Sequence, residues 1–165
     1  MILIEADLEF DFTDALDAIK FDDSGHALSH CMKAVDFVVE LADAYLFIEV
    51  KDPSHPHAHV QAVEQFEAIA TNGNLCKDIV KKFRDSFVYR WAVNKPEKPI
   101  HFLSLITLEE ALLNSIQDNL HKNLPLIGPS CWSRPIAASC HVLTIAAWNR
   151  NYPKWTVKRL SEAGI

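Results

Sequence analysis

The stretch from residue 33 to residue 53, KAVDFVVELADAYLFIEVKDP, constrains the fold most, because charged residues interrupt two runs that are otherwise apolar. The segment 40–44 between the runs contains Asp43 and is short enough for a hairpin turn. Side chains alternate between the faces of a strand, so Glu49 and Lys51 are neighbours on one face of the second run. The opposite face of that run is wholly branched aliphatic: Leu46, Ile48 and Val50.

The first run carries a single carboxylate at Asp36. Alternation places Val35, Phe37 and Val39 on one face of this run and Asp36 on the other. If the two runs pair as a hairpin, Asp36 lies beside Glu49 and Lys51. The sequence therefore predicts two carboxylates and an ammonium group converging on a sheet that is otherwise apolar.

Two interpretations of these charges remain open at this point. An antiparallel sheet often has one solvated face, and an E-x-K pair is common on such a face. Burying charges, by contrast, costs several kcal/mol per ion unless they are paired or bound to a metal. The isolation of Asp36 and the Asp52-Pro53 pair that closes the second strand favour a functional site.

Asp36 in an apolar strand, followed after a hairpin by Ile48-Glu49-Val50-Lys51, resembles the D…(D/E)-x-K signature of the PD-(D/E)XK, or restriction-endonuclease-like, nuclease superfamily. The resemblance is specific over residues 32–53 and topological elsewhere. It implies an α/β fold with a three-layer core, in which helices flank a mixed central β-sheet. The chain departs from the family at Val35, where the family has Pro. The helix that usually precedes the family's first strand is missing or very short, and Glu9 is a weak candidate for the metal-binding Glu of that helix.

The chemistry of this triad can be derived from its residue types. Two carboxylates suit Mg²⁺ (or Mn²⁺), a hard cation that prefers oxygen ligands and retains several waters. Asp36 and Glu49 are the expected ligands, with the carbonyl of Val50 as a third. Such a metal activates a water and screens charge on a phosphodiester. Lys51 supplies a point charge for the scissile phosphate or the attacking water.

Length and charge set the limits around this site. The 165 residues suit one domain, 1–165, with a substantial core. The net charge of −6 argues against a strongly basic nucleic-acid-binding domain, so a nuclease must rely on local basic patches and metal ions. No apolar run approaches the length of about 18 residues that spans a bilayer, and residues at the amino terminus do not show a basic region followed by an apolar one. Four widely spaced Cys residues suit reduced thiols, and we expect a cytoplasmic protein without membrane contact.

Periodicity predicts the remaining elements. Strands are expected at 8–12, 15–21, 100–107 and 141–148, although 15–21 also suits a short helical turn, and helices at 60–70, 76–93 and 107–120. A capping box with Thr107 as N-cap and Glu110 at N3 is expected to open the last helix. The 76–93 helix carries basic residues that either meet a phosphate backbone or, as is more common, form a solvated face: Lys77, Lys81, Lys82 and Arg84.

Two further segments have alternative interpretations. His55, His57 and His59 lie in a loop, where they either bind a transition metal or are simply exposed. The segment 149–159 interleaves aromatic and basic residues, which either stack on bases or clasp the tail to the domain. Cys131, Cys140 and His141 have poor spacing for zinc, and no phosphate-cradling glycine motif occurs.

Two functions from different classes follow. The first is a metal-dependent nuclease that hydrolyses phosphodiester bonds of nucleic acid, DNA being favoured over RNA, with Asp36, Glu49 and Lys51 in the site. Many members of the superfamily cut duplexes as dimers, so the resemblance is compatible with a homodimer. The second is a catalytically inactive module of the same fold that acts in protein binding or assembly, which the acidic charge balance favours.

Overall fold

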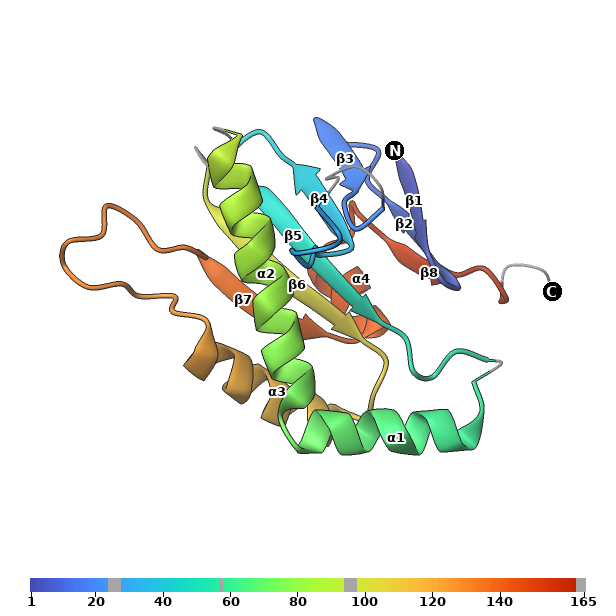
Figure 1. The fold of residues 1–165 in the computed structure, drawn as a ribbon. Coiled ribbons are helices and arrows are strands. Elements are labelled where there is room, and N and C mark those ends of the chain that lie inside the picture. Colours follow the sequence, from blue (N-terminus) through green and yellow to red (C-terminus); the bar gives the residue numbers. More distant parts are fainter. Residues whose placement is uncertain (24–27, 57, 94–97, 163–165) are drawn as a thin grey trace.

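The computed structural model describes residues 1–23, 28–56, 58–93 and 98–162, which form two sheets and four helices (Figure 1). The larger sheet contains, in spatial order, β3 (Asp17–Lys20), β4 (Phe37–Glu40), β5 (Tyr45–Lys51), β6 (Ile100–Ile106) and β7 (Ser139–Leu143). The smaller sheet contains β1 (Ile2–Glu5), β2 (Leu8–Asp11) and β8 (Val157–Arg159). The helices are α1 (Val60–Thr71), α2 (Asn74–Ala92), α3 (Glu110–Asn123) and α4 (Ile145–Asn151).

The larger sheet is mixed, which confirms the predicted α/β class with a mixed central sheet. β3, β4 and β5 are antiparallel neighbours, whereas β6 and β7 run parallel to β5. Parallel neighbours need crossover connections, which α1 and α2 provide between β5 and β6 and α3 provides between β6 and β7. The strand expected at 100–107 is confirmed as β6, and it pairs with β5 along its whole length, from Tyr45 opposite Ile100 to Lys51 opposite Ile106.

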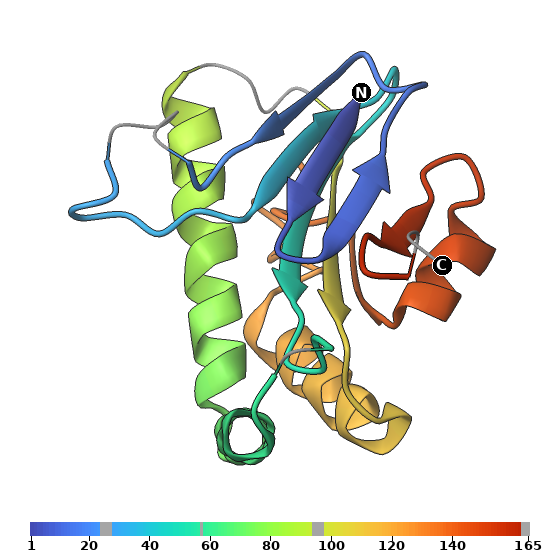
Figure 2. The same ribbon diagram turned by 90° about the vertical axis from the view of Figure 1, so that its right-hand side faces the viewer.

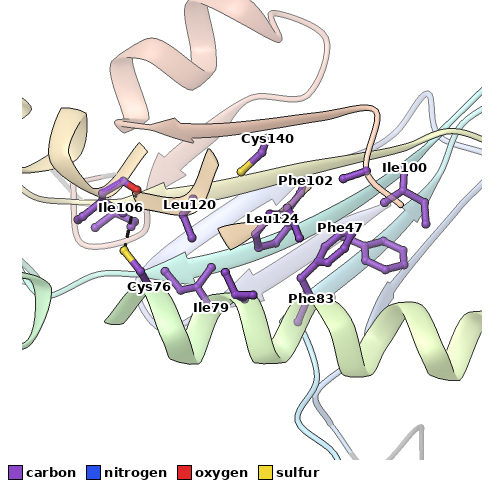
Figure 3. Close-up of a cluster of buried hydrophobic side chains, with 14 of the residues drawn as sticks. Phe47, Cys76, Ile79, Phe83, Ile100, Phe102, Ile106, Leu120, Leu124 and Cys140 are labelled. Atoms are coloured by element: carbon purple, nitrogen blue, oxygen red, sulfur yellow. Dashed lines mark hydrogen bonds between the residues drawn. The ribbon is translucent and has the colours of Figure 1, made fainter. Parts of the chain in front are cut away.

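One face of this sheet is covered by α2 and α3 (Figures 1 and 2). Three aromatic rings hold α2 in place, because Phe83 of the helix lies 5.7 Å from Phe47 and 5.0 Å from Phe102 between ring centroids. Figure 3 shows Ile79 and Phe83 directed from α2 towards the strands. This packing places the middle of α2 over β5, the strand that carries Glu49 and Lys51.

The other face is covered by the three-stranded sheet together with α4 (Figure 2). Leu8 and Phe10 of β2 and Trp148 of α4 are fully buried there against the aliphatic side of β4, β5 and β6. The indole N–H of Trp148 donates to the carbonyl of Trp155, 2.5 Å away, so the tail is held against the core. The molecule thus has three layers, but a small sheet forms much of the layer that the sequence assigns to helices.

The strand predicted at 141–148 is wrong in its second half. β7 ends at Leu143, and α4 begins at Ile145. The hydroxyl of Thr144 accepts a hydrogen bond from the backbone N–H of Ala147, 3.0 Å away, and so caps the helix. A short apolar run suits either structure, and here the capping residue decides between them.

Two further local predictions, for Thr107 and Val35, are wrong because each residue hydrogen-bonds to another segment of the chain. Thr107 does not cap α3, whose N-cap is Glu109; its hydroxyl instead donates to Asp52, 2.6 Å away. Val35 does not share a face with Phe37, because β4 begins only at Phe37 and Val35 packs on the α2 side. There the backbone N–H of Val35 donates to the hydroxyl of Ser86 on α2, 3.0 Å away.

The Cys residues divide between core and surface. Cys76 and Cys140 are buried between α2, α3 and the sheet, whereas Cys31 and Cys131 are exposed. Within the described ranges, no helix combines the length and apolar character that crossing a bilayer requires.

We predict that Phe83→Ala lowers the free energy of unfolding by about 3–5 kcal/mol, because it empties the contact that holds α2 against β5 and β6. The control is Val88→Ala on the same helix, where the side chain is half exposed and the expected loss is below about 1 kcal/mol. Denaturant unfolding of both variants measures the difference. Equal losses would contradict the role of Phe83 as the anchor of α2.

Candidate functional site

The structure brings Asp36, Glu49 and Lys51 to one face of the sheet beneath α2. Phe37 pairs with Ile48, so Asp36, one residue earlier, lies beside Glu49 across the β4–β5 hairpin. Asp36 is 3% exposed and Glu49 is 0% exposed, whereas the side chain of Lys51 at the end of β5 retains 24% of its surface. The solvated-face interpretation of the E-x-K pair is therefore wrong for Glu49, because its carboxylate is completely buried.

Asp36 directly precedes β4, and its side chain makes the next hydrogen bond to β5 beyond the backbone pairs of the hairpin. Its Oδ2 accepts a hydrogen bond from the backbone N–H of Val50, 2.6 Å away. Alternate residues of a strand direct their backbone groups to opposite neighbours, and the carbonyl of Lys51 accepts from Thr107 on the β6 side. The carbonyl of Val50 is therefore directed to the β4 side, where Asp36 stands.

Glu49 holds two ammonium groups at one oxygen and none at the other. Its Oε1 lies 2.5 Å from Nζ of Lys51 and 2.8 Å from Nζ of Lys82. Its Oε2 is buried and has no hydrogen-bond partner among the described residues. Burial first, and then the charge of Asp36, raise the pKa of Glu49 to about 7, although both lysines act in the opposite direction.

Lys82 of α2 belongs to this cluster, although the sequence analysis placed it only among the basic residues of the helix. Its Nζ lies 3.0 Å from Oδ1 of Asp36 as well as 2.8 Å from Glu49, and its side chain is only 16% exposed. Burial lowers the pKa of Lys82, but the two carboxylates outweigh this effect and raise it overall, so the ammonium stays charged. The solvated-face interpretation fails here.

A signal for Lys82 existed in the sequence. The buried stripe of α2 includes Leu75, Ile79 and Ser86, and Lys82 falls on the same stripe at spacings of three and four residues. A charged residue on the buried stripe of a helix needs a partner, and the unpaired carboxylates of the preceding hairpin were available.

Ser104 is a second residue that the sequence analysis did not single out. It stands opposite Glu49 in the parallel β5–β6 pairing, it is 0% exposed, and its hydroxyl has no hydrogen-bond partner in the described part of the chain. Paired residues of neighbouring strands lie about 5 Å apart on the same face. Two unsatisfied buried oxygens, Glu49 Oε2 and Ser104 Oγ, thus belong to adjacent residues, an arrangement typical of a site for a water or an ion.

Two other acidic residues, Glu9 and Asp22, lie outside this cluster or at its edge. Glu9 faces away from this site in the small sheet and pairs with Lys158 at 2.9 Å. Asp22 at the end of β3 hydrogen-bonds to Asp36, and burial together with the charge of Asp36 raises the pKa of Asp22 to about 6.

The histidine loop does not form a described metal site. His57 lies outside the described residues, and His59 precedes α1. His55 contributes only a minor part of the lowered pKa values of Asp7 and Asp52, which hydrogen bonds from Ser161 to Asp7 and from Arg159 to Asp52 lower more. Across the described ranges, no group of three or more His, Cys, Asp or Glu side chains is arranged to hold a metal. The site under α2 therefore offers two close carboxylates, with a backbone carbonyl directed towards them.

The tail clasps the domain in the described structure. Arg159 of β8 makes two contacts of 2.8 Å with the carboxylate of Asp52, which directly follows the E-x-K strand. The hydroxyl of Thr107 also binds Asp52, so β5, β6 and β8 are joined at this point. These contacts fix the end of β5 on which Lys51 stands.

Comparison with known proteins found no matching family model, no matching curated protein and no matching solved structure.

We predict that stability falls as the pH rises from about 4 to about 8, by an amount that depends on Glu49. The pKa of Glu49 is raised from 4.5 to about 7, so the folded state retains a proton that the unfolded state releases between these values. Each pKa unit corresponds to about 1.4 kcal/mol, so the effect is on the order of 3 kcal/mol. Glu49→Gln should remove this part of the pH dependence of urea unfolding.

The control for this measurement is Glu9→Gln, which removes a carboxylate from a surface ion pair in the small sheet. It should keep the pH dependence of the wild type. Identical curves for Glu49→Gln and the wild type would show that Glu49 does not titrate in this range.

Proposed function

We propose that the protein is a metal-dependent nuclease that hydrolyses phosphodiester bonds of nucleic acid, with DNA favoured over RNA. The observation that supports this proposal best is the buried cluster of Asp36, Glu49 and Lys51 under α2. Burying two carboxylates in an apolar sheet costs several kcal/mol per ion unless they are paired or bound to a metal. The order of β3, β4, β5, α2 and β6 is also what the resemblance to the PD-(D/E)XK superfamily implies.

The residues present fit a divalent cation such as Mg²⁺ or Mn²⁺. Glu49 Oε2 is a buried carboxylate oxygen without a hydrogen-bond partner among the described residues, and Asp36 stands beside it. With the carbonyl of Val50 these groups form an oxygen donor set of the kind that hard cations prefer. When bound, such an ion would lower the pKa of a water and screen the charge of a phosphodiester.

The chain's own residues have distinct parts in this proposal. Asp36 fixes the end of the hairpin through its bond to the N–H of Val50, so the two carboxylates keep their spacing. Glu49 is anionic above a pH of about 7, which makes it available as a ligand in neutral to alkaline solution. Lys51 is the more exposed of the two lysines, and its ammonium at the end of β5 is placed to contact a phosphate or to orient a water.

We predict that the wild type cleaves a mixture of single-stranded and double-stranded DNA and RNA in the presence of Mg²⁺ or Mn²⁺. Asp36→Ala and Lys51→Ala should each lower the rate by about 100-fold or more, because each removes a group that acts on the reacting phosphate or its metal. The control is Lys77→Ala, an exposed position on α2 that should keep the rate. Unchanged activity in both site variants would reject the assignment.

The alternative is a catalytically inactive module of this fold that acts in protein binding or assembly. The observation that favours it is Lys82, because two carboxylates and two ammonium groups already compensate one another. An ion-pair network of this kind can be purely structural. The two functions differ in metal binding, since a module without a site should show no calorimetric Mn²⁺ binding that depends on Glu49.

A further inference from the structure

The position of Lys82 bears on how the site under α2 takes up a cation. Its ammonium lies between the two carboxylates, 3.0 Å from Asp36 Oδ1 and 2.8 Å from Glu49 Oε1. It reaches them from α2, whereas Asp36, Glu49 and Lys51 all come from the β4–β5 hairpin. Lys82 therefore occupies, with a single positive charge, the place between the carboxylates.

Charge balance favours the departure of one lysine ammonium group when a divalent ion enters. Two ammonium groups compensate the two buried carboxylates of the cluster, and Asp22, which hydrogen-bonds to Asp36, adds a carboxyl group at its edge. A divalent ion beside both ammonium groups would leave an excess of positive charge in a largely buried place, even with Asp22 ionised. Repulsion between close charges is strong where water is excluded, so the departure of one ammonium group is favourable.

The contacts of Asp36 identify which ammonium that is. Asp36 Oδ2 is already bonded to the N–H of Val50, and Asp36 Oδ1 is held by Lys82. The oxygen of Asp36 that is not bonded to the backbone is therefore the one that Lys82 contacts. Lys51, by contrast, contacts Glu49 at the open end of β5 and can remain there.

Other carboxylates lie within reach of a displaced Lys82. Asp78 and Asp85 stand four residues before and three residues after it on α2, spacings at which helical side chains are neighbours. Both face the segment that leads to Asp36, because both contact Lys33. Asp78 pairs with the ammonium of Lys33, and Asp85 accepts a hydrogen bond from the backbone N–H of Lys33, 2.9 Å away. A lysine has four side-chain torsions, so its ammonium can swing between sites without movement of the helix.

We propose that Lys82 is a displaceable counter-ion that competes with the divalent cation for Asp36 and Glu49. The inference rests on the proposed metal-dependent function and adds a regulation of that site. Lys82 keeps the carboxylates compensated in the absence of metal and lowers the affinity for the ion. Metal binding moves the ammonium of Lys82 away from the carboxylates, towards solvent and the acidic residues of α2.

Calorimetric titration with Mn²⁺ at pH 8 tests this competition in the wild type, Lys82→Met and Lys51→Met. Methionine keeps most of the length of the lysine side chain and removes its charge. We expect Lys82→Met to bind Mn²⁺ at least about tenfold more tightly than the wild type, because a competing positive charge is gone. Lys51→Met is the matched control and should gain less, because Lys51 does not contact Asp36.

The outcomes separate this inference from the proposed function. Glu49-dependent binding that is equal or weaker in Lys82→Met overturns the competition and leaves the metal site standing. Absence of binding in both the wild type and Lys82→Met overturns both proposals. Binding that appears only in Lys82→Met supports the competition and rejects a metal-dependent function for the wild type.

A measurement on the wild type covers the case in which Lys82→Met does not fold. Mass spectrometry after brief treatment with an acetylating reagent reports how readily each lysine reacts. Saturation with Mn²⁺ should raise the reactivity of Lys82, whereas Lys77 and Lys81, which are exposed on the same helix, should not change. Unchanged or reduced reactivity of Lys82 overturns the proposal.

Discussion

The carboxylate of Glu49 has no exposed surface, and the arrangement around β5 follows from the need to compensate its charge. Lys51 supplies one ammonium from the same strand, two residues further along the same face. Lys82 supplies the second from α2, which lies over β5 because Phe83 packs between Phe47 and Phe102. The aromatic contact and the ionic contact are adjacent on the helix, so apolar packing determines where the charges meet.

The larger sheet is held in place by α3 at β7 and by β8 at the end of β5. On one side of the sheet, the edge of β7 is covered by α3, because Gln117 accepts from the N–H of Val142 and donates to the carbonyl of Cys140. Exposed edges of this kind otherwise pair with other chains. At the end of β5, Arg159 of the last strand grips Asp52. The site thus stands on elements fixed by distant parts of the chain, which suits groups that must keep a set spacing.

The same physics governs these four charges in a structural network and in the proposed metal site. A buried pair of carboxylates is expensive whether an ammonium or a metal compensates it. Glu49 Oε2 and Ser104 Oγ are both buried without hydrogen bonds in the described structure, which a purely structural network would ordinarily avoid. These two unsatisfied oxygens therefore favour a site that binds a cation, whereas the contacts of Lys82 favour a site whose negative charge is already compensated. Displacement of Lys82 reconciles the two observations.

Local patterns in the sequence determined much of this protein. The alternation in 36–51 predicted the hairpin and the shared face of Asp36, Glu49 and Lys51, because the side-chain period of a strand needs no tertiary information. The strand expected at 100–107 and the helix expected at 76–93 also followed from apolar periodicity, and the structure has them at 100–106 and 74–92. The run at 141–148 was ambiguous because an apolar stretch of that length packs equally well as strand or helix, and the cap at Thr144 resolved it.

Only the tertiary structure decided which charges meet. Lys82 is 31 residues from Lys51 along the chain, and nothing local distinguishes it from the exposed Lys77 and Lys81 except its place on the buried stripe of α2. Ser104 acquires its meaning from standing opposite Glu49, which depends on the parallel register of β5 and β6. The sequence alone fixes which residues share the face of one hairpin, whereas contacts between a helix and a sheet depend on packing that no local pattern specifies.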